Sequence, residues 1–439
     1  MTMNRNVLLF AGMFALIAFV GFAQSWSVAL TILNFCLISA IMALGVNIQW
    51  GYAGLFNVGI VGFTALGGLA AVLVSKPPVP EAWAAGGTGI GLSIVSLGVT
   101  IAAATIASRR MTGRWRKPVI LLIVVAGFFI TRAIFDPAVQ AIEAVDPAKT
   151  GYLGGLGLPI VLAWPVGGLL AAGVAWVIGK IALGLRSDYL AIATLGIAEI
   201  IIAVLKNEDW LARGVKNVSG LDRPVPREIN LQQSDWFIAL AGKIGADPVS
   251  FSSIFVKLSY AGLFAVVLLV ILWLSEKALH SPWGRMMRAI RDNRDAAEAM
   301  GKDVTKRHLQ VFILGSAVVG IAGAMMTTMD GQFTPGTYNP LRYTFLIWVM
   351  VIVGGSGNNW GAVLGGFLIW FVWVEAEPAA SWLMNLVTSG MYEGSALREH
   401  LVKSAPHMRL IVMGVILLLV LRFSPRGLIP EKGGRERPT

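Results

Sequence analysis

A succession of apolar runs, separated by short polar loops, constrains this chain more than any other feature of its sequence. Many runs approach the length of about 20 residues that a helix needs to cross a bilayer. Hydrophobic residues account for 56% of the 439 residues and charged residues for 13%, whereas a soluble surface carries roughly 25 to 35% charged residues. We therefore expect an all-α integral membrane protein, one transmembrane domain over residues 1–439 with about ten to twelve membrane segments.

The charged loops predict how these segments are oriented. The net charge of +11 lies mostly in short loops and at the C-terminus, which is typical of membrane topology and argues against a nucleic-acid partner. Residues 109–117 hold five basic side chains and no acidic one, so we expect this loop in the cytoplasm. The mixed charges of residues 207–253 fit a periplasmic loop, and parity places both termini in the cytoplasm. Residues 7–23 are expected to be a retained span, because no clear cleavage site follows them.

Two glycine-rich interruptions, residues 51–59 and 354–361, lie in opposite halves of the chain where it should be at or near membrane depth. Irregular backbone is tolerated there only if it is buried in protein or lines a wet cavity. Paired broken segments in the two halves of a transport protein indicate a central pathway, and we expect some segments to be broken or re-entrant. The candidate pathway residues are Gly51, Gly54, Asn57, Gly59, Gly354, Gly355, Gly357 and Gly361.

Glu199 is an ionisable residue near the middle of an apolar run. A charge at this depth is costly unless it faces a polar interior. A role in the pathway and a hydrogen bond to a neighbouring helix are equally compatible with this position, and we add Glu199 to the candidate pathway residues.

Residues 281–301, SPWGRMMRAIRDNRDAAEAMG, form the one long charged segment between two apolar runs. Ser281 can cap a helix, Pro282 suits its first position and Gly301 can end it in a left-handed conformation. We expect one amphipathic cytoplasmic helix. Its apolar side would comprise Met286, Ala289, Ile290, Ala296, Ala297 and Met300, opposite Arg288, Arg291, Arg294, Asp295 and Glu298. Such a helix can lie on the membrane lipid or dock in a partner's groove, and the small stripe with a mixed-charge rim favours the groove.

Signals for chemistry are largely missing from the sequence. There is no GxxxxGK[ST] phosphate loop, so we expect this chain to bind no nucleotide cofactor and to hydrolyse none itself. The four histidines show no metal-ligand spacing, and Cys36 is the only cysteine. We assign no catalytic residue and no metal ligand.

Four stretches carry a family resemblance. The segment SDYLAIATLGIAEIIIAVLKNEDWLARGVKNVSGL from Ser187, the segment from Ser281 to about residue 325, and VMVIVGGSGNNWGAVLGG from Val349 resemble the LivM-type permeases of branched-chain amino acid ABC importers. GYAGLFNVGIVGFTALGG from Gly51 is similar to the early glycine-rich element of the same permeases. Two departures are a longer stretch over residues 76–157, which reads as an insertion with an extra pair of spans, and KNVSGLDRP in place of a GGPNG-like turn.

The resemblance implies a transport subunit of a bacterial inner membrane. Its partners would be a second, LivH-like permease subunit, two cytoplasmic ATPase subunits that bind ATP and magnesium, and a periplasmic solute-binding protein. It further implies that residues 281–301 contact the ATPase. The residues that match the family pattern there are Arg288, Ala289, Ile290, Arg291, Ala297, Met300 and Gly301, and Glu199 matches the glutamate of a TLG-x-x-E-I element.

Two alternatives stay open. An ion-coupled secondary transporter would use Glu199 as the coupled carboxylate and need no ATPase. Within the ABC class, urea or short amides could be the cargo in place of branched-chain or other amino acids.

Overall fold

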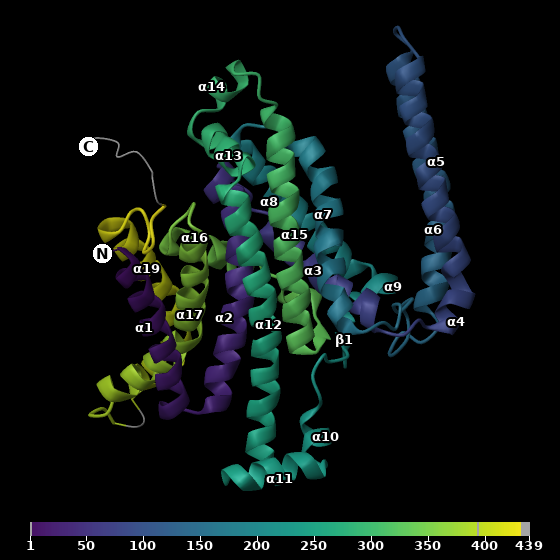
Figure 1. The fold of residues 1–439 in the computed structure, drawn as a ribbon. Helices are drawn as coiled ribbons and strands as arrows, with labels where there is room; N and C mark the ends of the chain where they lie inside the picture. The colour runs from purple at the N-terminus through teal and green to yellow at the C-terminus, as the bar shows by residue number, and fades with distance from the viewer. Residues whose placement is uncertain (1, 393–394, 432–439) are drawn as a thin grey trace.

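The computed structural model describes residues 2–392 and 395–431, which are mostly helical (Figure 1). Among these residues, ten helical segments are long and apolar enough to cross a membrane. They contain α1 (Thr2–Ala23), α2 (Trp26–Val46), α5 (Thr88–Arg110), α6 (Arg116–Glu143), α7 (Ala163–Ala182), α8 (Ser187–Asn207), α12 (Pro248–His280), α15 (Val304–Asp330), α17 (Asn359–Val387) and α19 (Met408–Phe423). Two shorter apolar helices are α3 (Ile60–Ser75) and α16 (Leu346–Gly354). The prediction of an all-α membrane protein with about ten to twelve segments is confirmed.

Short elements fill the connections. They are α4 (Pro80–Ala82), α9 (Asp209–Ala212), α10 (Glu228–Gln232), α11 (Asp235–Ile244), α13 (Pro282–Asp292), α14 (Arg294–Ala299) and α18 (Ala396–Ser404). The strands β1 (Val218–Ser219) and β2 (Gln332–Phe333) pair antiparallel. Residues 207–253 include α9, β1, α10 and α11, and α10 and α11 lie at the end of the molecule opposite α13 and α14 (Figure 1).

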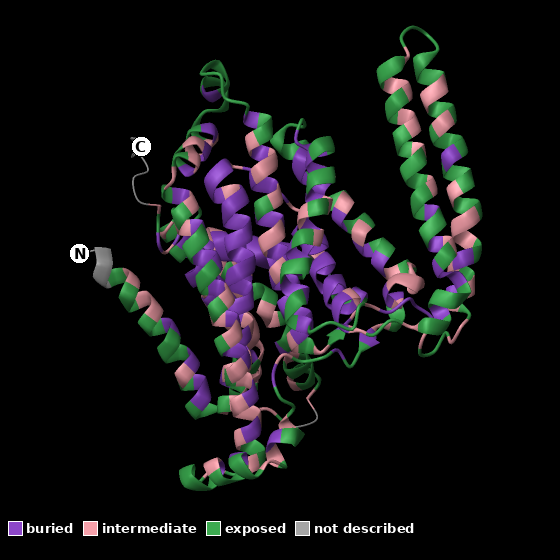
Figure 2. Cartoon of the chain, turned by 45° about the vertical axis from the view of Figure 1, so that its right-hand side comes forward, coloured by how far each residue is buried: buried purple, intermediate pink, exposed green. Residues whose placement is uncertain are grey.

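Small residues let three helices of the core approach closely. A Cβ atom added at Gly67 of α3 would lie 2.0 Å from the carbonyl oxygen of Gly320 in α15. A Cβ atom added at Gly320 would lie 2.5 Å from the carbonyl oxygen of Gly167 in α7. Lipid is as apolar as these side chains, so close backbone packing is a main source of helix association in a membrane. The buried residues gather around this centre and along α2 (Figure 2).

The hairpin of α5 and α6 stands apart from this core (Figures 1 and 2). Only 11% and 6% of the apolar windows in its two arms are buried, against 72% for the segment that contains α2. Its base is attached by a small apolar cluster that includes Ile90, Ile142 and Leu153, and by a 3.2 Å hydrogen bond from the Trp210 backbone N–H to Glu143. The two arms lie within residues 76–157, where the sequence predicts an extra pair of spans.

Helix α17 contains carboxylates within its apolar length. Helix α17 continues through Glu375 and Pro378 as far as Val387. Arg409 of α19 donates a hydrogen bond to Glu377. This pairing explains why a carboxylate is tolerated inside a long apolar helix, where composition alone suggests that the helix ends.

Candidate functional site

The charged segment 281–301 forms two helices, so the prediction of one continuous helix is wrong. Helix α13 begins as expected: the Ser281 side chain accepts a 3.3 Å hydrogen bond from the Gly284 N–H, and Pro282 occupies the first turn. It ends at Asp292, because the Asn293 side chain accepts a 3.0 Å hydrogen bond from the Ala296 N–H and starts α14. Asparagine often competes with the helix backbone in this way. Gly301 has the left-handed φ of +74° that its position predicts.

The break at Asn293 also changes which side chains are buried. Ile290 and Ala297 face the protein as predicted, with Ile290 only 2% exposed. In contrast, Ala289 is exposed and Met300 is 79% exposed, so these two do not belong to one buried stripe. In α13 the buried side chain beside Ile290 is that of Met287, not that of Ala289. Thus α13 is fixed to the protein by its apolar side, while α14 projects from it (Figure 1).

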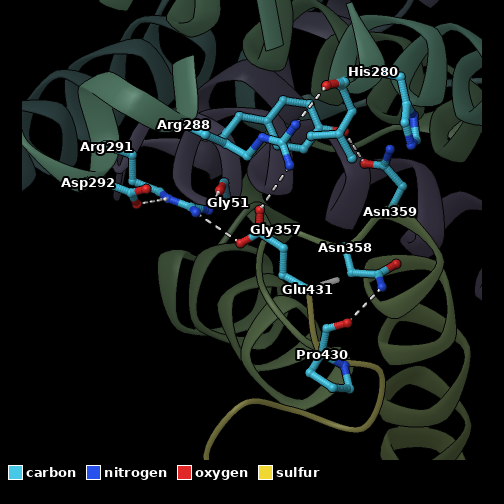
Figure 3. A network of polar contacts seen from close by, with 12 residues as sticks. Gly51, His280, Arg288, Arg291, Asp292, Gly357, Asn358, Asn359, Pro430 and Glu431 are labelled. Carbon is cyan, nitrogen blue, oxygen red and sulfur yellow. Dashed lines mark hydrogen bonds and ion pairs between the residues drawn. The ribbon is translucent and has the colours of Figure 1, made fainter. Parts of the chain in front are cut away.

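Two arginines of α13 point back into the protein and meet one carboxylate (Figure 3). Arg291 Nη2 donates to Glu431 Oε2 over 2.9 Å, and Arg288 Nη1 lies 3.7 Å from Glu431 Oε1. Arg291 Nη1 also donates to the carbonyl oxygen of Gly51. The side chains of Arg291 and Glu431 are 24% and 18% exposed, so this ion pair is half-buried and less screened than a surface pair.

Glu431 is positioned by the C-terminal segment, residues 427–431. The backbone N–H groups of Leu428 and Ile429 each donate over 2.9 Å, to the carbonyl oxygens of Val353 and Gly354. Asn358 Nδ2 donates to the carbonyl oxygen of Pro430 over 3.0 Å (Figure 3). The C-terminal segment is therefore bound to the second glycine-rich interruption, and its last described residue reaches α13.

The two glycine-rich interruptions meet each other directly beside α13. The Gly357 N–H donates to Asn47 Oδ1 over 2.8 Å, and Asn47 Nδ2 lies 3.1 Å from Asn359 Oδ1. A Cβ atom added at Gly51 would lie 2.5 Å from the Gly357 nitrogen. Because Gly357 has a φ of +82° and also closes on Gly51, this contact requires glycine on both sides. The approach of these two interruptions is the centre of the candidate site.

The first interruption begins at the end of α2. The helix changes there to a π-helical turn, Asn47–Tyr52, and the chain then continues to Gly54, which has a φ of +66°. Asn57 Nδ2 donates to Gln49 over 2.9 Å, and the Gly59 N–H donates to Asn57 Oδ1 over 2.9 Å.

The second interruption is the turn between α16 and α17. Gly355 has a φ of +119° there, and the side chain of Asn358 caps α17 by accepting from the N–H groups of Trp360 and Gly361. Gly354 and Gly361 are packed backbone to backbone. Two helices therefore meet at a glycine turn, which is one of the broken membrane segments that the sequence predicts.

A buried polar cluster extends from this contact into the core. Tyr52 Oη is hydrogen-bonded to Asn359 Oδ1, and Asn359 Nδ2 donates to Glu276 of α12 over 3.0 Å. Gln49 Nε2 donates to the Ser316 hydroxyl of α15 over 3.0 Å. Sequence reasoning did not select Asn47, Gln49, Tyr52, Glu276, Asn359 or Glu431. The sequence offers one signal for Asn47, Gln49 and Tyr52, because polar side chains there continue an apolar helix. No local sequence pattern marks Glu431.

Glu199 lies elsewhere. Its helix, α8, contacts the first interruption at Thr194, whose hydroxyl accepts a 3.1 Å hydrogen bond from the Val58 N–H. Glu199 itself is exposed, at the flank of the buried face of α8 that includes Ala198 and Ile202. Within residues 2–392 and 395–431 it makes no ion pair or side-chain hydrogen bond. The described part of the chain also brings no three potential metal-ligating side chains together.

Known proteins match this chain along most of its length. A family model described as "Branched-chain amino acid transport system / permease component" matches residues 28–421. The chain belongs to this permease family. The matched range includes both glycine-rich interruptions, Glu199, α13 and α14, and it ends before Glu431.

Individual relatives of this permease are distant. A probable branched-chain amino acid transport permease protein LivM from Methanocaldococcus jannaschii is 25% identical over 70% of this chain and 77% of its own length. The LivM permease of the high-affinity branched-chain amino acid transport system of Escherichia coli is 26% identical over 66% of this chain. The permease spans only 61% of that bacterial relative. A xylose transport permease, XylH of E. coli, is 26% identical over 36% of the chain. No solved structure matches the permease.

Proposed function

We propose that this chain is a transmembrane permease subunit of an ATP-driven importer for branched-chain or other amino acids. It acts with a second, LivH-like permease, two cytoplasmic ATPase subunits that bind ATP and magnesium, and a periplasmic solute-binding protein that delivers the cargo. The chain itself transports and does not hydrolyse ATP. Its membership of the permease family and the LivM relatives support this proposal. A probable branched-chain amino acid transport permease protein LivH is also 33% identical to this chain over 24% of its length.

The orientation in a bacterial inner membrane follows from the basic loops. The tip of the α5–α6 hairpin, with its basic residues 109–117, lies at the same end of the molecule as α14 (Figure 1). The C-terminal segment lies beside α13 at this end, and Phe10 of α1 contacts Trp360 at the start of α17. Basic loops mark the cytoplasmic face. We propose that this face is cytoplasmic and carries α13, α14, the start of α1 and the C-terminal segment, and that the face with α10 and α11 is periplasmic.

The observation that supports an ATPase contact is the bent pair α13–α14. It connects two membrane-spanning helices, α12 and α15, and its Ala289 and Met300 side chains are exposed. Arg288 and Arg291, which the family resemblance also assigns to the contact, are engaged by Glu431. In our proposal the ATPase contacts the exposed residues, whereas the arginines hold α13 to the permease.

Co-purification tests this proposal. The tagged chain, extracted gently from its native membrane, should carry a nucleotide-binding subunit with ATPase activity. Ala289→Glu and Met300→Glu should each reduce the amount of that subunit, because they place a charge on the contacting surface. Lys243→Glu, an exposed change on α11 at the other face, is the matched control. Recovery of the chain alone under several detergents would contradict the proposal.

One observation favours the ion-coupled alternative. Glu199 is an exposed carboxylate within a membrane-spanning helix and has no partner in the described residues, and an ionisable group in a span marks a functional site by default. Uptake that survives ATP depletion but collapses with the ion gradient would support it. Urea or short amides as cargo are distinguished from amino acids by competition for uptake in the complete transporter.

A further inference from the structure

Arg291 of α13 is linked to both glycine-rich interruptions. It donates a hydrogen bond to the Gly51 carbonyl oxygen of the first, and it pairs with Glu431, whose segment is bound to the second. No other charged side chain of α13 within the described residues contacts both. A displacement of α13 therefore acts on the two interruptions together through Arg291.

Glycines of both interruptions lie directly against this contact. A Cβ atom added at Gly357 would lie 2.7 Å from Glu431 Oε2 and 3.1 Å from Arg291 Nη1. A Cβ atom added at Gly54 would lie 3.3 Å from Arg291 Cγ. Closely packed groups shift together and do not deform independently. The glycines thus let the ion pair sit directly against both turns.

Separating Glu431 from Arg291 when α13 moves costs free energy unless another group replaces the lost partner, because half-buried charges are left unpaired. Three hydrogen bonds hold the C-terminal segment: the Leu428 and Ile429 N–H groups donate to carbonyl oxygens at the end of α16, and the Asn358 side chain of the following turn donates to the Pro430 carbonyl oxygen. A displacement of Glu431 therefore acts on the end of α16 and on the turn that follows it.

We propose that Glu431 is a positioning residue that transmits the movement of α13 to the turn between α16 and α17, with residues 427–431 as the connecting segment. This inference rests on the proposed function as an ABC permease. Arg291 transmits the same movement to the first interruption through Gly51. ATP-driven displacement of α13 then moves the two interruptions together, and the C-terminal segment is a working part of the transporter.

The test uses the complete complex in proteoliposomes and measures amino-acid uptake per ATP hydrolysed. Glu431→Gln keeps the shape of the side chain and removes its charge. We expect unchanged co-purification of the ATPase, retained ATP hydrolysis, and uptake per ATP lowered about fivefold or more, a typical size for coupling between sites. Glu431→Asp, which keeps the charge, should recover part of the loss.

A matched control lies on the α5–α6 hairpin, away from the bent pair. Asp136 pairs with Arg132 over 3.0 Å, four residues apart on α6, and both side chains are about half exposed. Asp136→Asn removes an exposed pair of the same type without touching either interruption. It should leave uptake per ATP unchanged.

A second variant covers failure of Glu431→Gln to fold. Asn358→Asp retains the oxygen that caps α17 but loses the N–H donor to Pro430, so it weakens the attachment and not the ion pair. It should lower uptake per ATP in the same direction.

Uptake per ATP equal to wild type in both variants would overturn the proposal. Loss of the ATPase from the Glu431→Gln complex would also overturn it, because Glu431 would then act in assembly. If the wild-type complex neither hydrolyses ATP nor takes up amino acids, the proposed function itself fails.

Discussion

The backbone N–H of Gly357 donates to the side chain of Asn47 over 2.8 Å, and this bond joins two turns 310 residues apart in the chain. Asn47 is fully buried, and its amide nitrogen lies within hydrogen-bonding distance of Asn359. The contact brings the two glycine-rich interruptions together under α13. That they line the route of the cargo stays a prediction. In the structure both are attached to α13, which belongs to the segment that we propose contacts the ATPase.

Asn47→Ala should destabilise the protein. It leaves the Gly357 N–H without a partner in a buried site and removes one of the hydrogen bonds of the Asn359 side chain, and an unsatisfied buried group costs about 1 to 3 kcal/mol. Thermal unfolding of the purified chain in detergent measures the effect. Asn230→Ala, at an exposed position of α10, is the control, and equal stability of the two variants would argue against the role of Asn47.

Alanine substitutions at two glycines distinguish the effect of close helix packing on stability from the effect of helix propensity. Gly320→Ala adds a methyl group 2.5 Å from the Gly167 carbonyl oxygen, and overpacking of this kind costs about 1 to 3 kcal/mol. A Cβ atom added at Gly173, in α7, meets nothing within 4 Å. Gly173→Ala should therefore be neutral or stabilising by up to about 1 kcal/mol. The yield and melting temperature of the two folded variants should differ in this direction; the reverse order would contradict the close approach of α7 and α15.

Some of this site follows from local sequence, and some cannot. The cap at Ser281, the left-handed Gly301 and the glycine turn before α17 depend on neighbouring residues, so the sequence predicts them. The Arg291–Glu431 pair joins residues 140 positions apart, and no local pattern marks Glu431. The break at Asn293 was missed because one asparagine outweighed an otherwise helical pattern.

Glu199 shows, for a single side chain, that contacts set by distant parts of the chain cannot be predicted from local sequence. The sequence places it correctly near the middle of a span, but its direction depends on how α8 packs against α3 and α7. The structure places it outside the chain's own core. Local sequence constrains depth in the membrane far better than it constrains which side of a helix is buried.

Glu199→Gln should leave the folding of this chain unchanged, because the carboxylate has no partner within the described residues. Glu199 is a candidate pathway residue in our account, so amino-acid uptake by the complete transporter should fall. Melting temperature and uptake, measured on the same preparation, separate the two effects. A large loss of stability with normal specific uptake would show that the residue is structural.

Asp247 caps α12 and gives a pH-dependent contribution. Hydrogen bonds from the backbone N–H and hydroxyl group of Ser250 lower the pKa of the Asp247 carboxyl group below its ordinary value of 3.8. A carboxyl group whose pKa is lower in the folded protein stabilises it above the ordinary pKa, and this contribution disappears as the pH falls through the folded-state pKa. Asp247→Ala should therefore lower the melting temperature at pH 7 and have a smaller effect in strong acid. An effect independent of pH would exclude this mechanism.

The most direct test of the central claim is uptake of radiolabelled leucine by proteoliposomes that contain this chain with its co-purified partners and the solute-binding protein. ATP enclosed on the side of α13 should drive uptake, and uptake should persist when ionophores remove the proton and sodium gradients. Uptake that ignores ATP and disappears with an ion gradient would contradict an ABC permease and favour an ion-coupled transporter.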